Sequence, residues 1–142
     1  MKHFLMVLTI GFFMMGTAVA ADINQYKGKW INTDKNTRGI TKIVFAGDGG
    51  GKMNVHVWGK CSPQDCDWGW KPCNSYYDGH FSARYQNDFS IKNLTINLIS
   101  RGKLKVKVHT RFTDNSGRSE RENTYTFRRL LKPVTQTPKP IS

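Results

Sequence analysis

The segment from Lys103 to Phe112 shows the clearest hydrophobic pattern in the chain, because apolar and basic residues alternate along it. The apolar positions are Leu104, Val106, Val108 and Phe112, and the basic ones are Lys103, Lys105, Lys107, His109 and Arg111. Successive side chains of a β-strand point to opposite faces of a sheet. The pattern therefore predicts a strand with one face in a core and a basic face toward solvent.

The same period of two recurs through most of the chain after residue 25, and no window sustains the helical period of about 3.6 residues. Further strands are predicted at Tyr26–Asn32, Ile40–Phe45, Met53–Trp58, Gly79–Tyr85, Phe89–Lys92, Leu94–Ser100 and Arg121–Leu130. Together with the first segment they make about eight strands and an all-β fold.

A glycine-rich connection at residues 47–51 can adopt positive φ and close a hairpin between the second and third of these strands. Pairing through this turn is expected to place Trp58 beside Ile40, and His56 beside Lys42, on the face away from the core. Trp58 and Ile40 would then form a small exposed apolar patch next to the cysteines.

The turn sequence at residues 114–117 predicts a second hairpin, between the last two strands. Folding the chain back around this turn makes apolar residues face apolar ones and bases face acids. The expected pairs are Leu104 with Phe127, Val106 with Tyr125, His109 with Glu122 and Arg111 with Glu120. A slip of one residue would turn every side chain to the other face, so this agreement favours the register.

The first twenty residues have the three parts of a secretion signal. Lys2 and His3 precede an apolar run from Phe4 to Met15, and small residues at 18–20 suit cleavage before Ala21. The apolar run is shorter than the roughly twenty residues that a membrane-spanning helix needs. We therefore expect no membrane span after signal cleavage, and a protein that is secreted or periplasmic.

The rest of the chain suits a single domain over residues 21–131, followed by a flexible tail at 132–142 that contains Pro133, Pro138 and Pro140. The formal net charge of +12 favours anionic partners, such as an anionic envelope component or an acidic protein. The same charge is also common in secreted proteins that bind nothing anionic and merely stay in solution.

Three cysteines lie close together, at Cys61, Cys66 and Cys73. The intervening Ser-Pro-Gln-Asp stretch reads as a turn, which favours a Cys61–Cys66 disulfide and leaves Cys73 free or paired between molecules. Pairings of Cys73 with Cys61 or with Cys66 stay open. The spacing lacks a C-x-x-C pair and a nearby histidine, so neither a metal site nor a cofactor is expected.

Aromatic residues are concentrated around these cysteines, at Trp58, Trp68, Trp70, Tyr76 and Tyr77. Rigid exposed rings can stack on sugars or anchor a ligand, and the same rings can instead fold over the core as a plug. No G-x-S-x-G, H-E-x-x-H or phosphate-loop motif is present, and Asp65 and Asp67 are more typical of a turn than of a catalytic pair. No enzymatic activity is expected.

The predicted register turns Arg129 toward the core, where Trp30 offers a flat ring for its guanidinium. Gly28-Lys29-Trp30, with an arginine closing the last strand, resembles the calycin pattern of avidins and lipocalins. In that family the tryptophan of a G-x-W on the first strand packs against such an arginine. The resemblance implies a single antiparallel up-and-down β-barrel, structural roles for Trp30 and Arg129, and a ligand inside or at the open mouth.

Four segments are also similar to a group of small, uncharacterised secreted bacterial proteins, which implies a domain type and no chemistry. They are His56–Cys61, Cys66–Trp70, Asp114–Arg118 and Phe127–Arg129. The sequence thus favours a non-enzymatic binding protein that holds a glycan or small hydrophobic ligand at the barrel mouth and its aromatic loop. The alternative is a basic envelope or inhibitor protein that docks an acidic partner through Lys103, Lys105, Lys107 and Arg111.

Overall fold

The computed structural model describes residues 23–75 and 79–131. The predicted signal segment, the predicted tail and the two tyrosines Tyr76 and Tyr77 lie outside these residues. Within the described part, no helix has the length and apolar character needed to cross a bilayer.

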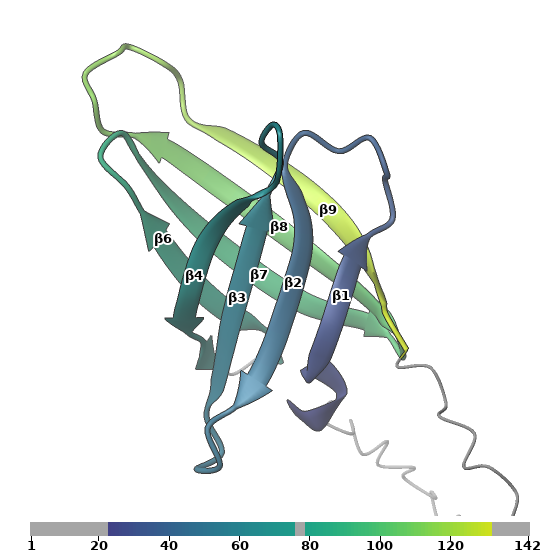
Figure 1. Cartoon of the computed structure of the whole chain (residues 1–142). Coiled ribbons are helices and arrows are strands. Elements are labelled where there is room, and N and C mark those ends of the chain that lie inside the picture. The colour runs from purple at the N-terminus through teal and green to yellow at the C-terminus, as the bar shows by residue number, and fades with distance from the viewer. Residues whose placement is uncertain (1–22, 76–78, 132–142) are drawn as a thin grey trace, which may run out of the picture.

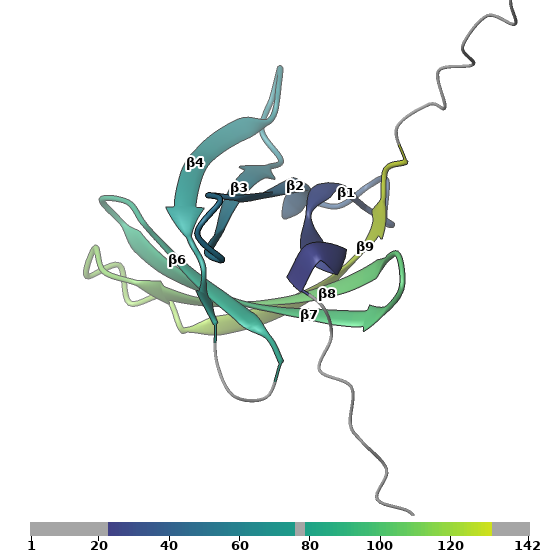
Figure 2. The same ribbon diagram turned by 90° about the horizontal axis from the view of Figure 1, so that it is seen from below.

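Residues 23–75 and 79–131 form one antiparallel sheet of nine strands, which curls into a nearly closed barrel (Figures 1 and 2). A short 3-10 helix, η1 (Ile23–Tyr26), precedes the first strand. The strands are β1 (Gly28–Asn32), β2 (Ile40–Gly47), β3 (Met53–Gly59), β4 (Cys66–Pro72), β5 (Asn74–Ser75), β6 (Phe81–Gln86), β7 (Ser90–Ser100), β8 (Lys103–Phe112) and β9 (Arg121–Arg129). The order β4-β3-β2-β1-β9-β8-β7-β6-β5 is that of an up-and-down barrel, so the predicted fold class is confirmed.

The barrel is left open along part of one seam, between β4 and β6. β4 pairs with β3, and the chain runs on through Cys73 into the two-residue β5, which pairs with β6. One segment therefore joins both edges of the sheet at its lower end, while no backbone ladder joins the upper halves of β4 and β6. In the described part, the Tyr85 hydroxyl spans this gap, 3.1 Å from the Val55 carbonyl oxygen and 3.0 Å from that of Gly69.

The lower end of the barrel is filled by rings. Trp30 is fully buried, and its Nε1 donates a hydrogen bond of 2.8 Å to the Tyr26 carbonyl of η1. The Arg129 guanidinium lies 4.8 Å from the Trp30 ring centroid, so the contact expected from the calycin-like pattern is present. The Tyr26 hydroxyl donates to the Gly79 carbonyl and accepts from the Leu98 amide, both at 3.1 Å, which fastens η1 across this end (Figure 2).

The β8–β9 register is as predicted, with Leu104 opposite Phe127 and His109 opposite Glu122. The ion pairs, however, run diagonally: His109 pairs with Glu120 at 2.9 Å and Lys107 with Glu122 at 3.4 Å. The expected Arg111–Glu120 pair is wrong, because β9 begins only at Arg121 and Glu120 turns to His109 instead.

The predicted β2–β3 register is wrong by two residues. Trp58 lies opposite Lys42, His56 lies opposite Val44, and a bulge between Ile40 and Lys42 turns Ile40 inward. Because Ile40 is only 1% exposed, the expected Trp58–Ile40 surface patch does not exist.

Three element boundaries also differ from the prediction. Tyr26 belongs to η1, and the first strand starts at Gly28. The predicted break at Asn93 is absent, because β7 runs through it against the long partner β8. β4 was not predicted: Gly69 with φ +81° and a bulge opposite 56–58 interrupt its alternation, so the segment resembles a loop in sequence.

Candidate functional site

The upper end of the barrel is a mouth with a cavity of about 510 Å³, a size that suits a small molecule. It is opposite the end that η1 covers, and the strand ends and connections that surround it supply its walls. The lining residues are Arg38, Gly39, Ile40, Gly59, Lys60, Cys61, Cys66, Asp67, Trp68, Tyr85, Gln86, Asn87, Phe89, Ser90, Lys92, Val108, Thr110, Arg121, Asn123 and Tyr125.

One wall of the mouth is aromatic. Trp68 from β4 and Tyr85 from β6 meet edge to face, with ring centroids 5.6 Å apart, and Tyr125 and Phe89 add further rings. Burial raises the pKa of both Tyr85 and Tyr125, so both hydroxyls stay neutral at physiological pH.

Two glycines make room for these rings. A Cβ at Gly59 would lie 2.7 Å from Cζ2 of Trp68, and a Cβ at Gly39 would overlap the Tyr125 hydroxyl. Glycine at these positions therefore lets the rings of Trp68 and Tyr125 approach the backbone more closely than a larger residue would allow.

Beside these rings the mouth is cationic, and Lys92 is central to this positive charge. Along β7 the inward positions are Ser90, Lys92, Leu94 and Ile96, so Lys92 shares a face with the buried apolar residues Leu94 and Ile96. Its ammonium donates to Ser90 Oγ at 2.7 Å and lies 5.6 Å from the Trp68 ring centroid. The pKa of Lys92 is lowered, first by burial and then by the positive charges of Arg121 and Arg118.

Positive charge prevails in the mouth. Arg38, Lys60, Lys92 and Arg121 line it, and in the described part none of the four forms an ion pair. The carboxylate among the lining residues, Asp67, accepts hydrogen bonds from the Gly69 amide and the His56 ring. These bonds lower the pKa of Asp67. Its carboxylate is thus paired with His56 and the Gly69 amide, and not with Lys92.

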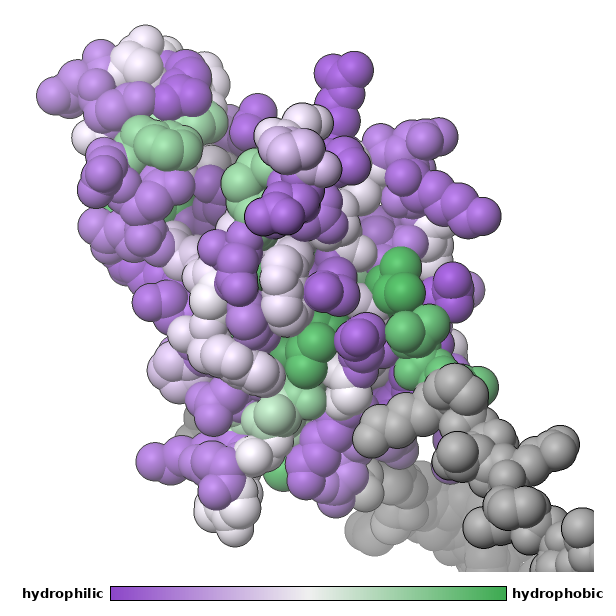
Figure 3. All heavy atoms as spheres, in the orientation of Figure 1, coloured by the Kyte–Doolittle hydropathy of each residue, from purple (hydrophilic) through white to green (hydrophobic). Residues whose placement is uncertain are grey.

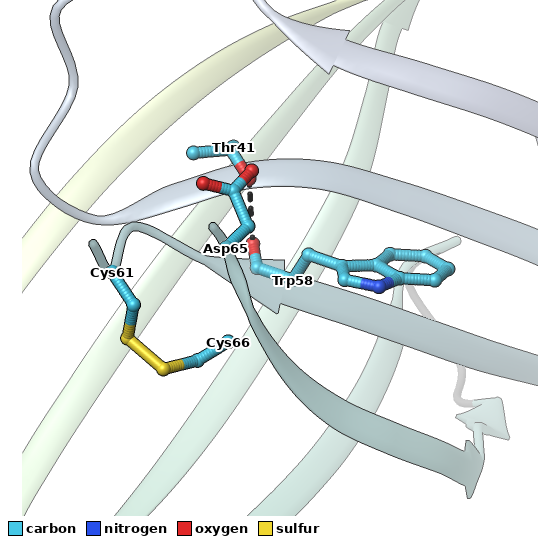
Figure 4. Close-up of a disulfide and its surroundings, with 5 residues drawn as sticks. All are labelled: Thr41, Trp58, Cys61, Asp65 and Cys66. Atoms are coloured by element: carbon cyan, nitrogen blue, oxygen red, sulfur yellow. Dashed lines mark hydrogen bonds between the residues drawn. A yellow bond between two sulfur atoms is a disulfide. The ribbon is translucent and has the colours of Figure 1, made fainter. Parts of the chain in front are cut away.

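A disulfide fixes the rim at the β3–β4 connection. Cys61 and Cys66 are bonded, as predicted, with their Cα atoms 5.4 Å apart. Beside them, the Thr41 hydroxyl lies 2.6 Å from Asp65 Oδ2 and 3.2 Å from the Trp58 carbonyl, as Figure 4 shows. The start of β4 is thereby anchored to β2 and β3, and Trp68 follows only two residues later.

The predicted aromatic set is divided between two surfaces. Trp68 faces the mouth, whereas Trp58 and Trp70 lie on the outer face of β3 and β4, where both contact the His56 ring. Trp58 stacks on His56 at 3.7 Å with Lys42 3.9 Å from its ring centroid, and Trp70 is 49% exposed. Of these three tryptophans Trp68 lines the mouth, and the ligand-binding roles of Trp58 and Trp70 stay predictions for a separate surface.

The outer face of β1–β4 is mixed in character. Figure 3 shows hydrophilic residues over most of this side of the molecule and apolar ones near β1 and β2. Ile31 and Val44 are half-buried outward residues of these two strands. This face differs from the outer face of β8, which carries the predicted basic residues Lys103, Lys105, Lys107 and Arg111, all exposed.

The sequence pattern did not predict that five further residues line the mouth together. They are Tyr85, Phe89, Lys92, Arg121 and Tyr125. A signal for Lys92 existed, because it alternates with Ser90, Leu94 and Ile96 once residues 90–100 are taken as one strand. The false break at Asn93 removed that signal. Arg121 likewise alternates with Tyr125 and Phe127 on the inner side of β9.

Cys73 is a free, half-buried thiol packed against the core. Burial raises its pKa to about 12, so it stays protonated and unreactive at neutral pH. No three histidine, cysteine or acidic side chains within residues 23–75 and 79–131 lie close enough together to hold a metal ion.

The chain matches no protein-family model, and searches of curated proteins and of solved structures find no significant match. Function is therefore inferred from the geometry of the mouth.

Proposed function

We propose that this chain is an exported, non-enzymatic binding protein with a calycin-like barrel, which holds a small ligand at its mouth. One observation carries the proposal: the barrel is filled with rings at the η1 end but keeps a cavity of about 510 Å³ at the other, walled by Trp68, Tyr85 and Tyr125. The ligand is a small hydrophobic molecule or a single sugar unit with one flat apolar face, which can pack against these rings.

Two features support a binding role over a merely plugged barrel. Gly39 and Gly59 keep the rings of Tyr125 and Trp68 against the strands, so the cavity is held open. The Cys61–Cys66 disulfide holds the rim in place without ligand, which reduces the entropy lost on binding. The disulfide also suits the oxidising compartment of an exported protein.

The experiment uses N-phenyl-1-naphthylamine, an uncharged probe whose emission rises in apolar surroundings. We expect saturable binding to the full chain and a loss of affinity of about tenfold in Trp68→Ala, because the probe loses an aromatic wall. Trp70→Ala is the matched control: it removes the same ring from the outer face, and its affinity should stay within about twofold of the wild type.

Absence of saturable binding would exclude the proposal for flat apolar ligands. Equal losses in Trp68→Ala and Trp70→Ala would also contradict it, because the probe would then be bound elsewhere.

A second candidate function, docking of an acidic partner, is favoured by the outer face of β8. Lys103, Lys105 and Arg128 are exposed, and in the described part none of them has a carboxylate partner. Lys105 lies between Asn97 and Thr126, whose polar groups can add hydrogen bonds to an anion. Lys107, in contrast, is paired with Glu122.

Heparin, a sulfated polysaccharide, tests this second candidate. Affinity should fall about tenfold or more between 50 and 200 mM salt, as expected for roughly three released counterions. Lys105→Gln should weaken binding more than Lys107→Gln, because the Lys107 charge is already neutralised. Binding that is insensitive to salt, or equal effects of the two variants, would argue against this face.

A further inference from the structure

Lys92 is held in place by a directed chain of hydrogen bonds. Asn87 Oδ1 accepts from the amides of Phe89 and Ser90 and from the Ser90 hydroxyl. Because the hydroxyl proton of Ser90 is used on Asn87, its oxygen is left to accept from the Lys92 ammonium. Ser90 is buried, so the position of the ammonium is fixed before any ligand arrives.

A neutral hydroxyl does not balance the charge of this ammonium. Lysine has three N–H donors, and the bond to Ser90 uses one of them. The ammonium lies 5.6 Å from the Trp68 ring centroid and 5.8 Å from the Phe89 ring centroid, and Lys92 lines the cavity. A half-buried cation without a carboxylate reduces stability, and an anion in the cavity would remove that penalty.

Two arginines extend the positive charge across the rim. Arg118 lies 3.9 Å from the Phe112 ring centroid and Arg121 lies 5.4 Å from it, and both repel the Lys92 ammonium. Asp114 neutralises Arg118 at 2.6 Å, whereas within the described residues Arg121 has no acidic partner. In the described part of the chain, Lys92 and Arg121 are thus two unpaired lining cations that repel each other, and an anion held by both would relieve that repulsion.

We infer that the mouth selects small amphipathic anions, whose carboxylate, sulfonate or phosphate group is held by Lys92 and Arg121 while the apolar body lies against Trp68 and Tyr85. This inference rests on the proposed function, since it specifies the ligand of the same cavity. The cavity volume of about 510 Å³ limits the ligand to a small molecule, in contrast to the polymer expected on the outer β8 face.

Two probes with the same body separate the charge from the apolar contact. N-phenyl-1-naphthylamine is neutral, and 1-anilinonaphthalene-8-sulfonate adds a single sulfonate to it. At low salt we expect the wild type to bind the sulfonate at least about tenfold more tightly, as charge-assisted hydrogen bonds to a lysine and an arginine would provide.

Lys92→Met keeps the length of the side chain and removes its charge. The preference for the sulfonate should fall to about twofold or less, while the affinity for the neutral probe stays the same or rises. Lys105→Met is the matched control, because it removes one charge from the exposed outer face of β8 and should leave the preference unchanged. Where Lys92→Met does not give the wild-type circular dichroism spectrum, Arg121→Gln provides the same test at the other cation.

The outcomes distinguish the two proposals. A wild type that binds the neutral probe through Trp68 but shows no preference for the sulfonate overturns the inference and leaves the proposed function standing. A preference that survives both Lys92→Met and Arg121→Gln, or that Lys105→Met reduces equally, also overturns it. Failure of both probes to bind removes the proposed function and the inference together.

Discussion

The two ends of the barrel use the same pair of groups, a cation over a tryptophan, with opposite results. At the lower end the Arg129 guanidinium lies 4.8 Å from the Trp30 ring, and at the mouth the Lys92 ammonium lies 5.6 Å from the Trp68 ring. Trp30 is fully buried under η1, which also accepts its indole hydrogen bond, whereas Trp68 borders a cavity. A cation–aromatic pair is thus part of the core where the chain covers it, and part of a cavity wall where it does not.

The largest expected difference between the two ends is in stability. Trp30→Ala should lower the free energy of unfolding by about 3–5 kcal/mol, because it empties a fully enclosed site. Trp68→Ala should lower it by less than about 2 kcal/mol, since the ring is only half-buried. Urea denaturation of both variants measures this contrast, and equal losses would contradict the distinction between a filled end and an open one.

Removal of the disulfide should affect the mouth more than the rest of the barrel. With a sequence separation of 5, opening the Cys61–Cys66 loop is expected to destabilise the protein by about 2 kcal/mol through chain entropy. Hydrogen exchange in the Cys61→Ser/Cys66→Ser variant should accelerate more in β4 than in β1 and β9, where only the global loss of stability contributes. Uniform acceleration throughout the barrel would show that the rim is not an independent unit.

A methyl group at Gly59 should close the mouth without unfolding the barrel. Gly59→Ala places a Cβ against the Trp68 ring, which must shift toward the cavity. The expected cost is about 1 kcal/mol in stability and a several-fold loss of affinity for N-phenyl-1-naphthylamine. Gly49→Ala is a control in which the new Cβ meets no atom within 4 Å, although its positive φ of 84° adds backbone strain. It should reduce stability without affecting probe affinity.

The smallest effect concerns pH. The pKa of Lys92 is lowered from 10.5 in the folded chain, so the charged form is disfavoured by folding. The resulting penalty is fully present below the folded pKa and disappears as pH rises toward 10.5. Wild type should therefore be slightly less stable than Lys92→Met near pH 7, by under about 1 kcal/mol, and the gap should narrow up to pH 10.

Other charged and titratable groups also line the mouth near Lys92. They are the same in the wild type and in Lys92→Met, so the difference in stability between the two proteins reports on Lys92. Arg118 and Arg121 repel the ammonium, Asp67 lies on β4, and Tyr85 and Tyr125 remain neutral because burial raises their pKa. Affinity for the sulfonate probe should decrease over the same pH range in the wild type and stay constant in Lys92→Met. A gap in stability that widens with pH would show that Lys92 is not destabilised by its surroundings.

Much of the lower end and of the back of the barrel could be predicted from sequence. In β8 and β9 the burial and charge patterns agree, so one register satisfies both, and the positions of Arg129 and Trp30 follow from it. The Cys61–Cys66 disulfide could also be predicted, because a short turn between the two residues limits their separation.

The mouth could not be predicted, for local reasons. The bulge at Ile40 and the positive φ of Gly69 break the alternation from which side-chain direction is inferred. Asn93, a poor strand former, concealed the continuity of β7 and with it the inward position of Lys92. The short helix η1 determines which end is open, because it covers the other end. It is held there by the hydrogen bonds of the Tyr26 hydroxyl to Gly79 and Leu98, which are distant in sequence.

The chain that runs from β4 into β5 changes its hydrogen-bonding partner halfway, from β3 to β6. The sheet is therefore continuous around the lower end of the barrel, and it is interrupted between β4 and β6 at the upper end. In the described part, the Tyr85 hydroxyl and its ring contact with Trp68 bridge the split. Opening this gap further would change the contacts of one side chain, Tyr85, whereas opening a full ladder would break several backbone hydrogen bonds.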